Sequence, residues 1–479
     1  MKKNFFWISI AVFLLAFVVA GFWLVRFLVS ANGRALVARE VVTHILTTNT
    51  QEANYVQEAL GFTSPQTYLV LLLNNTELRP GGGFIGAYAI VRFDKGAPDI
   101  IKAEGTEILD NYAPTAFSTP PAPLQKYLGT TKWQFRDSNW SPDFPTSAST
   151  SLAMYAAEHG VDAEQIDGVI GFTPTVVENI LKITGPITVA GQTYTSDTFT
   201  KQLEYQVEYA YASEGISTKN RKQMLGELAQ ALLPRLVTTG VTHWADYAAL
   251  LPRMFAEKQL IFYSVHPKLE AALEANNLNG SMEGAPEDYL LWVDANLGAL
   301  KTDASITRHL TYDLAPEGNG YVATATMQFV HSGTFDWRTT RYRDYARVFV
   351  PIGSQFLSVS GSMATDKSPL PGVVDQGVEN GRQWFGTFFS LEPGQAHTLS
   401  FHYRLPPTLS TEMAAASLYT LRVQKQLGTL APQLTVHLDF GTKGVASTSP
   451  SGVITPSTHS VVFSSSLLTD RTFAVGFSQ

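Results

Sequence analysis

The sequence predicts an α/β layered domain followed by an all-β immunoglobulin-like sandwich, with one N-terminal transmembrane helix. Three observations predict this fold class. The chain has 479 residues, which is too many for one ordinary core. Helical and strand patterns alternate up to about residue 300, whereas short alternating strands follow one another after Ala304. Finally, Phe5–Val25 is an apolar stretch without charge.

The N-terminal stretch is long enough to be a membrane anchor. Phe5–Val25 has 21 residues, and a helix needs about 20 to cross a bilayer. A signal-peptide core is only ~7–15 residues long, which favours an uncleaved anchor, although the small residues Val29–Ala31 keep cleavage open. We expect a tail and anchor in 1–29, a juxtamembrane helix in 30–62, and the bulk of the chain outside the cytoplasm.

Residues 63–303 alternate between the two kinds of pattern, which is typical of an α/β layered domain. Short apolar runs bounded by turn residues predict strands, and amphipathic stretches behind Pro, Asp or Thr predict helices. We expect strands at 68–73, 87–93, 99–103 and 166–172, and helices at 145–160 and 173–183 and beginning near 197 and 218.

Residues 304–479 have a different pattern of polar and apolar residues. Segments such as "YVATATMQFVH", "RQWFGTFFSL" and "PQLTVHLDF" alternate polar with apolar residues, and Gly, Pro and Asp separate them. Many short strands with turn signals predict an antiparallel β-sandwich. The boundary between the two units is expected near Leu300–Ser305.

Composition excludes several classes of function. The sequence contains no cysteine, which rules out disulfides, thiolate metal sites and thiol nucleophiles. The formal charge is −7 and no long basic run occurs, which argues against nucleic acid as a partner. Among the ten histidines no metal-like pair such as H-x-x-x-H is found, and no G-x-S-x-G elbow occurs.

A charged, glycine-rich corner separates two predicted strands in "LLLNNTELRPGGGFIGAYAIVRF". It is neither a P-loop nor a dinucleotide-binding fingerprint, because no Gly-Lys-Ser/Thr ends it and a strand follows it. Gly81, Gly82 and Gly83 either form a turn that needs positive φ, or they present backbone amides to an anion beside the forked donor Arg79.

A second polar stretch, "RDSNWSPDFP", precedes a predicted helix. Arg136 would contact phosphate, and Asp137 and Asp143, together with Glu77 of the corner, would hold Mg²⁺. The alternative is an Asx-type turn and a helix N-cap.

A third candidate, "TKNRKQMLGEL", begins a helix. The alternatives for Lys219, Lys222 and Gln223 are an anion site and a solvated basic face. A bound anion would relieve the unfavourable interaction of these cations with the helix dipole. Aromatic residues of the second unit, such as Trp337 and Trp384, are interpreted as core and edge packing rather than as a sugar platform.

Several phrases resemble a bacterial envelope family, the domain of unknown function numbered four thousand and twelve. They are "LLLNNTELRPGGGFIG", "RDSNWSPDFP", "IDGVIGFTPTVVENILKITGPI" and "YTLRVQKQLGT", and the resemblance extends over nearly the whole chain after the apolar stretch. This family has no established activity, so the resemblance supplies no mechanism.

The order of elements is also similar, more distantly, to the LytR-CpsA-Psr phosphotransferases. That resemblance implies transfer of glycans from polyprenyl-pyrophosphate carriers with magnesium and arginines. Glu77–Arg79 stands where those enzymes have an Asp-x-Arg corner, and Lys219–Gln223 matches an Arg-x-x-Arg-Gln helix start in charge. An arginine and a metal-binding aspartate of those enzymes are not matched near Gly82–Gly86 and Ala103–Thr106.

Two hypotheses follow. In the first, the α/β domain binds a phosphorylated, polyprenyl-pyrophosphate-linked glycan precursor at the outer membrane face, with Mg²⁺, and transfers it or only holds it. In the second, the protein is a non-catalytic structural or adhesion-type envelope component. It would act through its β-sandwich, with the α/β domain as a relic scaffold.

Overall fold

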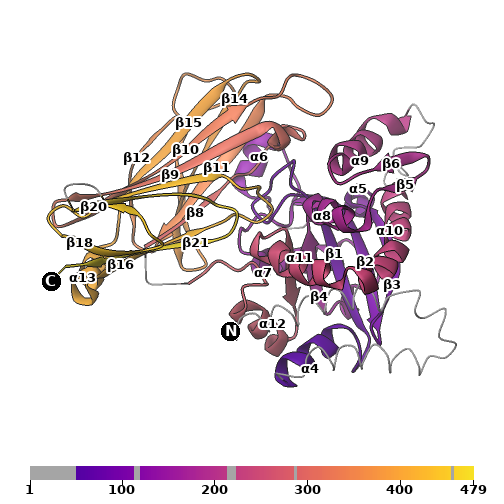
Figure 1. The fold of residues 1–479 in the computed structure, drawn as a ribbon. Coiled ribbons are helices and arrows are strands. Elements are labelled where there is room, and N and C mark those ends of the chain that lie inside the picture. Colours follow the sequence, from indigo (N-terminus) through magenta and orange to yellow (C-terminus); the bar gives the residue numbers. More distant parts are fainter. Residues whose placement is uncertain (1–49, 113–118, 213–222, 285–287, 455–457, 479) are drawn as a thin grey trace.

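The computed structural model describes residues 50–112, 119–212, 223–284, 288–454 and 458–478. Figure 1 shows two packed bodies: a β-sandwich of long strands, and a sheet covered by helices. The predictions for residues 1–49, which include the anchor Phe5–Val25 and most of the helix in 30–62, lie outside the described residues. The described part of that second segment forms α4 (Thr50–Ala59).

A mixed five-stranded sheet forms the first body, in the order β3-β2-β1-β4-β7. Its central strand, β1, pairs in parallel with β4 and antiparallel with β2. The two edge strands pair antiparallel with their neighbours. The strands are β1 (Gln66–Asn74), β2 (Phe84–Asp94), β3 (Ala97–Gly105), β4 (Gly168–Phe172) and β7 (Leu260–Ser264).

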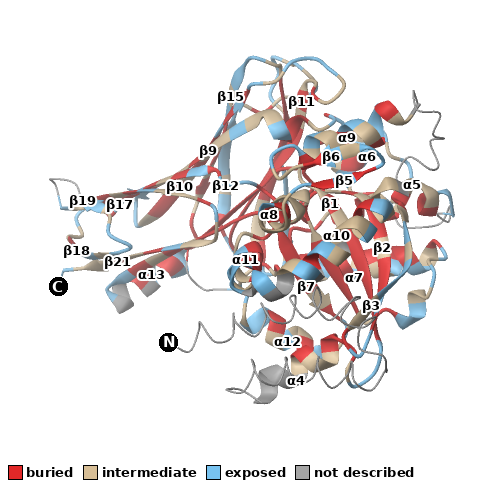
Figure 2. Ribbon diagram, turned by 45° about the vertical axis from the view of Figure 1, so that its right-hand side comes forward, coloured by how far each residue is buried: buried red, intermediate tan, exposed pale blue. Residues whose placement is uncertain are grey.

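Strand β1 is apolar almost throughout because both of its faces are covered. Tyr68 and Val70 point into one core, and Leu69 and Leu71 point into another, as the period-two alternation of a strand requires. Figure 2 shows the central strands buried beneath helices with partly exposed outer faces. This burial makes the end of β1 a rigid support for the corner that follows it.

Helices cover the two faces of this sheet (Figure 1). The core that contains Tyr68 also takes side chains from α8, α11 and α12, whereas the core that contains Leu69 takes them from α7. A small hairpin, β5 (Ile187–Val189) and β6 (Gln192–Tyr194), packs with α9 and α10. The helices are α5 (Thr106–Leu109), α6 (Ala122–Leu128), α7 (Phe144–Ala157), α8 (Pro174–Thr184), α9 (Phe199–Glu208), α10 (Gln223–Thr242), α11 (Trp244–Ala256) and α12 (Pro267–Ala275).

The second body is a sandwich of two seven-stranded sheets around one large apolar core. The first sheet is β12 (Gln355–Ser360), β15 (Ala396–Arg404), β10 (Gly320–His331), β9 (Ile306–Glu317), β17 (Gln433–Asp439), β20 (Ser460–Ser466) and β19 (Val453–Ile454). The second is β13 (Asp375–Glu379), β14 (Arg382–Leu391), β11 (Tyr342–Pro351), β8 (Asp288–Val293), β16 (Leu418–Gln424), β21 (Arg471–Phe477) and β18 (Val445–Ser449). Helix α13 (Pro407–Ala416) links β15 to β16.

The predicted fold class is corrected by these observations. The described residues form a mixed α/β structure with several β-sheets, and the sandwich is not purely antiparallel, because β9 pairs in parallel with β17 and β8 with β16. Within the described ranges, no helix is long and apolar enough to cross a membrane. An alternating pattern reveals which face of a strand is buried but not the direction of its partner, so antiparallel pairing throughout did not follow from the sequence.

Strand β8 lies in the range assigned to the α/β domain from the sequence, yet it forms hydrogen bonds only within the sandwich, as far as the described strands show. It pairs with β11 on one side and β16 on the other. Every residue of β8 is buried. A short, mostly apolar run carries no signal of which sheet it joins.

Candidate functional site: the charged corner between the two units

The glycine-rich corner follows β1 and lies where the two bodies meet. Gly82 and Gly83 have φ of +117° and +150°, which side chains rarely adopt. A Cβ on Gly83 would lie 2.6 Å from the carbonyl of Asn74. The amides of Gly81, Gly82 and Phe84 donate to the carbonyls of Asn139, Arg79 and Glu77 at 3.0, 3.0 and 2.8 Å. These three amides are therefore used inside the protein and do not form a nest open to an anion.

Arg79 is buried in this corner, with 3% of its surface exposed. Its Nε lies 3.1 Å from Asp137 Oδ1, its Nη2 lies 3.5 Å from Glu77 Oε1, and its Nη1 donates to the carbonyl of Asn296. Burial opposes the charge, but Asp137, Glu77 and Asp303 outweigh it and raise the pKa of Arg79. The guanidinium is thus a permanent cation whose charge is balanced by neighbouring carboxylates.

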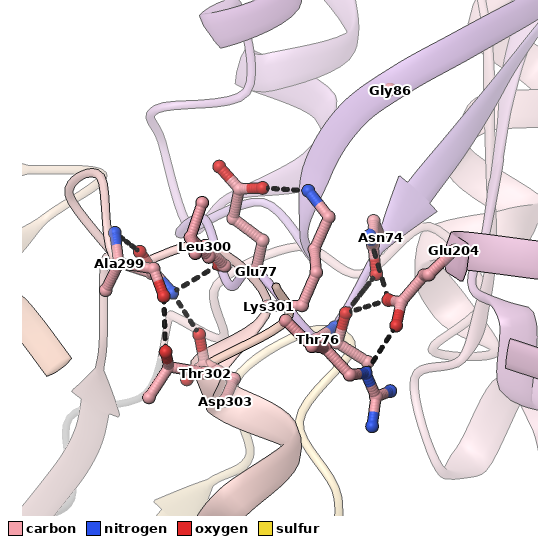
Figure 3. Close-up of polar contacts among 12 residues, drawn as sticks. Asn74, Thr76, Glu77, Gly86, Glu204, Ala299, Leu300, Lys301, Thr302 and Asp303 are labelled. Carbon is pink, nitrogen blue, oxygen red and sulfur yellow. Dashed lines mark hydrogen bonds and ion pairs between the residues drawn. The ribbon is translucent and has the colours of Figure 1, made fainter. Parts of the chain in front are cut away.

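Figure 3 shows further polar contacts of the same corner. Lys301 Nζ lies 2.5 Å from Glu77 Oε2, and its pKa is raised because Glu77 and other nearby carboxylates outweigh its burial. Glu204 of α9 accepts from Thr76 and from Arg338 Nε, the latter at 2.7 Å. The corner therefore connects α9 of the first body to a loop of the second through alternating charges.

Arg136 belongs to a separate cluster. Its Nε pairs with Asp110, which lies against the buried carboxyl of Glu158. Burial and the charge of Asp110 raise the pKa of Glu158 to about 7. Glu158 Oε1 accepts from Phe135 N at 3.0 Å, and its Oε2 is buried without a hydrogen-bond partner among the described residues. Arg136 and Arg79 are thus neutralised by different carboxylates.

The carboxylates predicted to hold magnesium have other partners in this structure. Glu77 and Asp137 are occupied by Lys301 and Arg79. Asp143 is the N-cap of α7: its Oδ2 accepts from Thr146 N at 3.0 Å and its Oδ1 from Met282 N at 2.8 Å. In the part of the chain that the structure describes, no group of three His, Asp or Glu residues is arranged to hold a metal ion.

The third predicted group is only partly visible. Lys219 and Lys222 lie outside the described residues, and Gln223 is the first residue of α10. The structure therefore brings together Glu77, Arg79, the corner glycines and Asp137, and leaves Arg136 and Asp143 in neighbouring but separate contacts.

Several residues at this junction were missed from the sequence. The amide of Leu78 donates to Asp303 Oδ2 at 3.0 Å. Asp303 also pairs with Arg308, whose Nε lies 2.6 Å from Asp294 Oδ2. Nearby Asp344 is fully buried, and burial and the charge of Asp294 raise its pKa well above the usual range. The contact between Leu78 and Asp303 has no local signal, because the two residues are 225 positions apart in the chain.

A third chain segment closes the corner from the other side. Gln426 Nε2 donates to the carbonyl of Arg79 at 3.2 Å, and Gly81 forms a bridge with Leu427. Gly428 has φ of +73°, and a Cβ there would lie 1.8 Å from the carbonyl oxygen of Gly82. Three of the phrases that carry the family resemblance, at 71–86, 136–145 and 419–429, therefore meet at this junction.

Comparison with known proteins gives a match to one family model over part of the chain. Residues 63–208 match the family described as "Protein of unknown function (DUF4012)". No curated protein matches the chain. Among solved structures, the chain is similar to a putative nutrient binding protein from Legionella pneumophila subsp. pneumophila, at 8% identity and a TM-score of 0.24 over 40% of this chain and 72% of that one.

A second similar structure is an M1 zinc metallopeptidase from Deinococcus radiodurans. The identity is 13% and the TM-score 0.17, and the match covers 36% of this chain and 41% of that one. The chain thus spans less than half of that enzyme. Both TM-scores are too low to carry an argument about function.

Proposed function

We propose that this protein is a non-catalytic structural or adhesion-type component of the bacterial cell envelope. In this proposal the α/β unit, a scaffold of the LytR-CpsA-Psr kind, holds the β-sandwich rigidly in place. The observation that carries the proposal is the neutralisation of Arg79 by Asp137 and Glu77 inside the junction. A phosphotransferase would need that cation free to meet a pyrophosphate.

The contacts around Arg79 support a structural role for the same residues. The pair Arg79–Asp137 joins two loops of the α/β unit, and the bond from Arg79 to Asn296 reaches the segment after β8 of the sandwich. Residues that look like an anion site in the sequence thus hold two bodies together. Removing either partner of such a buried ion pair destabilises the fold, because the other charge would remain buried alone.

The helix α6 supports the same proposal on another side. Tyr127 stacks on Phe388 of β14 with ring centroids 4.1 Å apart, and Arg343 Nη2 donates to the carbonyl of Tyr127 at 2.9 Å. Trp140 lies beneath Arg347, 5.1 Å from its guanidinium carbon. Polar and aromatic contacts therefore surround the junction, as expected for two units that move as one.

The test uses the full chain with magnesium and a short polyprenyl pyrophosphate, and follows binding by native mass spectrometry and phosphate-bond cleavage in the same sample. We expect no magnesium-dependent cleavage. Magnesium-dependent cleavage that is lost in Lys222→Gln or Arg136→Gln would overturn the proposal in favour of a transferase. Asp99→Ala, which changes an exposed carboxylate of β3, is the matched control.

A further inference from the structure

Three aromatic rings form an exposed cluster where α9 meets the loop between β10 and β11. Tyr205 and Tyr209 are 40% and 58% exposed, and Trp337 is partly exposed. The ring centroids of Tyr205 and Trp337 lie 5.2 Å apart, those of Tyr205 and Tyr209 5.3 Å, and those of Tyr209 and Trp337 6.2 Å. We call these three residues the aromatic platform.

The platform is held rigidly from both sides. Glu204 precedes Tyr205, Arg338 follows Trp337, and these two neighbours form an ion pair with Arg338 Nε 2.7 Å from Glu204 Oε2. The loop that carries Trp337 is closed by Asp336, whose Oδ1 accepts from the amides of Arg338 and Thr339, both at 2.7 Å. A surface that is already ordered loses little conformational entropy when it binds a ligand.

Phe335 in the same loop is also 63% exposed, so the apolar surface extends beyond the three rings, and a cluster is more informative than a single exposed residue. An aromatic face carries partial negative charge and attracts the positively polarised C–H groups of a stacked ring. Hydrogen-bonding groups lie close by, because Glu208 and Asp336, the chain neighbours of Tyr209 and Trp337, are exposed. An apolar face bordered by such groups suits a ligand that has both C–H faces and hydroxyl groups.

The charges around the platform select against acidic ligands. Of the described residues there, Glu77, Glu204, Glu208 and Asp336 are carboxylates, and Lys301, Arg338 and Arg79, which pairs with Glu77, are cations; Glu77, Glu204 and Glu208 act together on Lys301. Four negative charges against three positive ones leave a net negative charge, which disfavours phosphates and anionic membranes. The platform is also small compared with the ~800 Å² per partner that a stable protein interface buries.

We propose that the aromatic platform binds a neutral glycan by stacking sugar rings on Tyr205, Tyr209 and Trp337. This inference goes beyond the proposed scaffold role and gives the protein a ligand. The hydroxyl groups of the glycan would form hydrogen bonds with the charged side chains beside the platform, as in other polar recognition by ionised groups. The platform differs from the anion site predicted at the glycine-rich corner, because the net negative charge around the platform disfavours anions.

The test measures binding of cellohexaose and chitohexaose, two neutral hexasaccharides, to the full chain by isothermal titration calorimetry at millimolar sugar. We expect at least one to bind, and Trp337→Ala and Tyr209→Ala each to weaken binding by roughly tenfold or more. Trp337→Phe should keep part of the affinity. Tyr112→Ala, which removes a 64% exposed tyrosine elsewhere, should change nothing.

Three results would overturn this proposal: no binding of either hexasaccharide, binding that both alanine variants leave unchanged, or stronger binding of the anionic polymer polygalacturonate. The thermal unfolding midpoint of each variant shows whether it is folded, and Tyr209→Ala replaces Trp337→Ala if the latter unfolds. A failure here leaves the scaffold proposal standing, because that proposal depends on the absence of pyrophosphate cleavage and not on glycan binding.

Discussion

Arg79 shows how one residue can look like a ligand-binding group and act as a structural one. Replacing it with alanine leaves Asp137 buried without its cation, whereas Glu77 keeps Lys301. We expect Arg79→Ala to lower the free energy of unfolding by about 3–5 kcal/mol, measured by urea denaturation. Arg92→Ala, an exposed arginine of β2, should change it by less than about 0.5 kcal/mol. Equal stability of the Arg79 variant and the wild type would contradict the structural role.

Glu158 predicts a pH dependence at the same scale. Its pKa is raised to about 7 in the folded protein, so the folded state holds a proton that the unfolded chain releases near pH 4.3. Between these values the folded state binds more protons, and stability falls as pH rises. Glu158→Gln keeps a neutral, isosteric side chain, so its stability relative to the wild type should increase from pH 5 to pH 8, on the order of 1–3 kcal/mol.

The comparison with Glu158→Gln is needed because other groups titrate in the same range. The buried amine of Lys425 also has a pKa of about 7, lowered by burial and by Lys258. Subtracting the variant's stability curve from that of the wild type removes this contribution. Two parallel curves of unfolding midpoint against pH would show that Glu158 is ionised in the folded protein.

At the scale of elements, the role of Asp143 can be tested, because it is either a helix cap or a metal ligand. Its two oxygens accept from Thr146 N in the first turn of α7 and from Met282 N. Asp143→Ala should therefore cost about 2 kcal/mol of stability by thermal denaturation, and the control Asp99→Ala almost nothing. Neither magnesium nor EDTA should shift the midpoint of the wild type. A magnesium-dependent increase that is lost in Asp143→Ala would instead identify a metal site.

Local signals predicted several elements well. The apolar run at 68–73 lies within β1, the run at 87–93 lies within β2, and the Thr173–Pro174 start matches the first residue of α8. These elements are specified by their own residues: apolar runs, glycine turns and proline at the first helical position. The N-cap alternative for "RDSNWSPDFP" is also what Asp143 does in the structure.

The junction could not be predicted in this way. The acceptor for Leu78 N is Asp303, 225 residues away, and the donor to Arg79 O is Gln426, 347 residues away. The sequence around a charged loop residue does not show whether that residue faces solvent or a distant carboxylate. Likewise, the exposed position of Trp337 depends on the turn made by Asp336 and on packing against Tyr205 of α9.

At the scale of the whole molecule, Gly428 tests whether the two bodies unfold as one. A side chain there would meet the carbonyl oxygen of Gly82, so Gly428→Ala must push the two bodies apart. We expect one calorimetric transition for the wild type and two for this variant. Gly394→Ala is the matched control, because Gly394 has a similar φ of +77° with nothing within 4 Å of the added Cβ, and it should cost only about 1 kcal/mol. Two transitions in the wild type would show that the junction does not couple the bodies, and a single transition in Gly428→Ala would show that this contact is not needed for the coupling.

Strand β8 determines where this protein can be divided. It lies between β11 and β16 in the middle of a sandwich sheet, although it precedes every other strand of the sandwich in the chain. A fragment that begins at Ser305 would lack it, leaving two unpaired strand edges and an open slot in the core that invites association with other chains. The same strand must wait for β16, encoded more than a hundred residues later, before its pairing is complete. Synthesis of the chain must therefore pass β16 before this sheet can close, which makes folding of the sandwich slow and late.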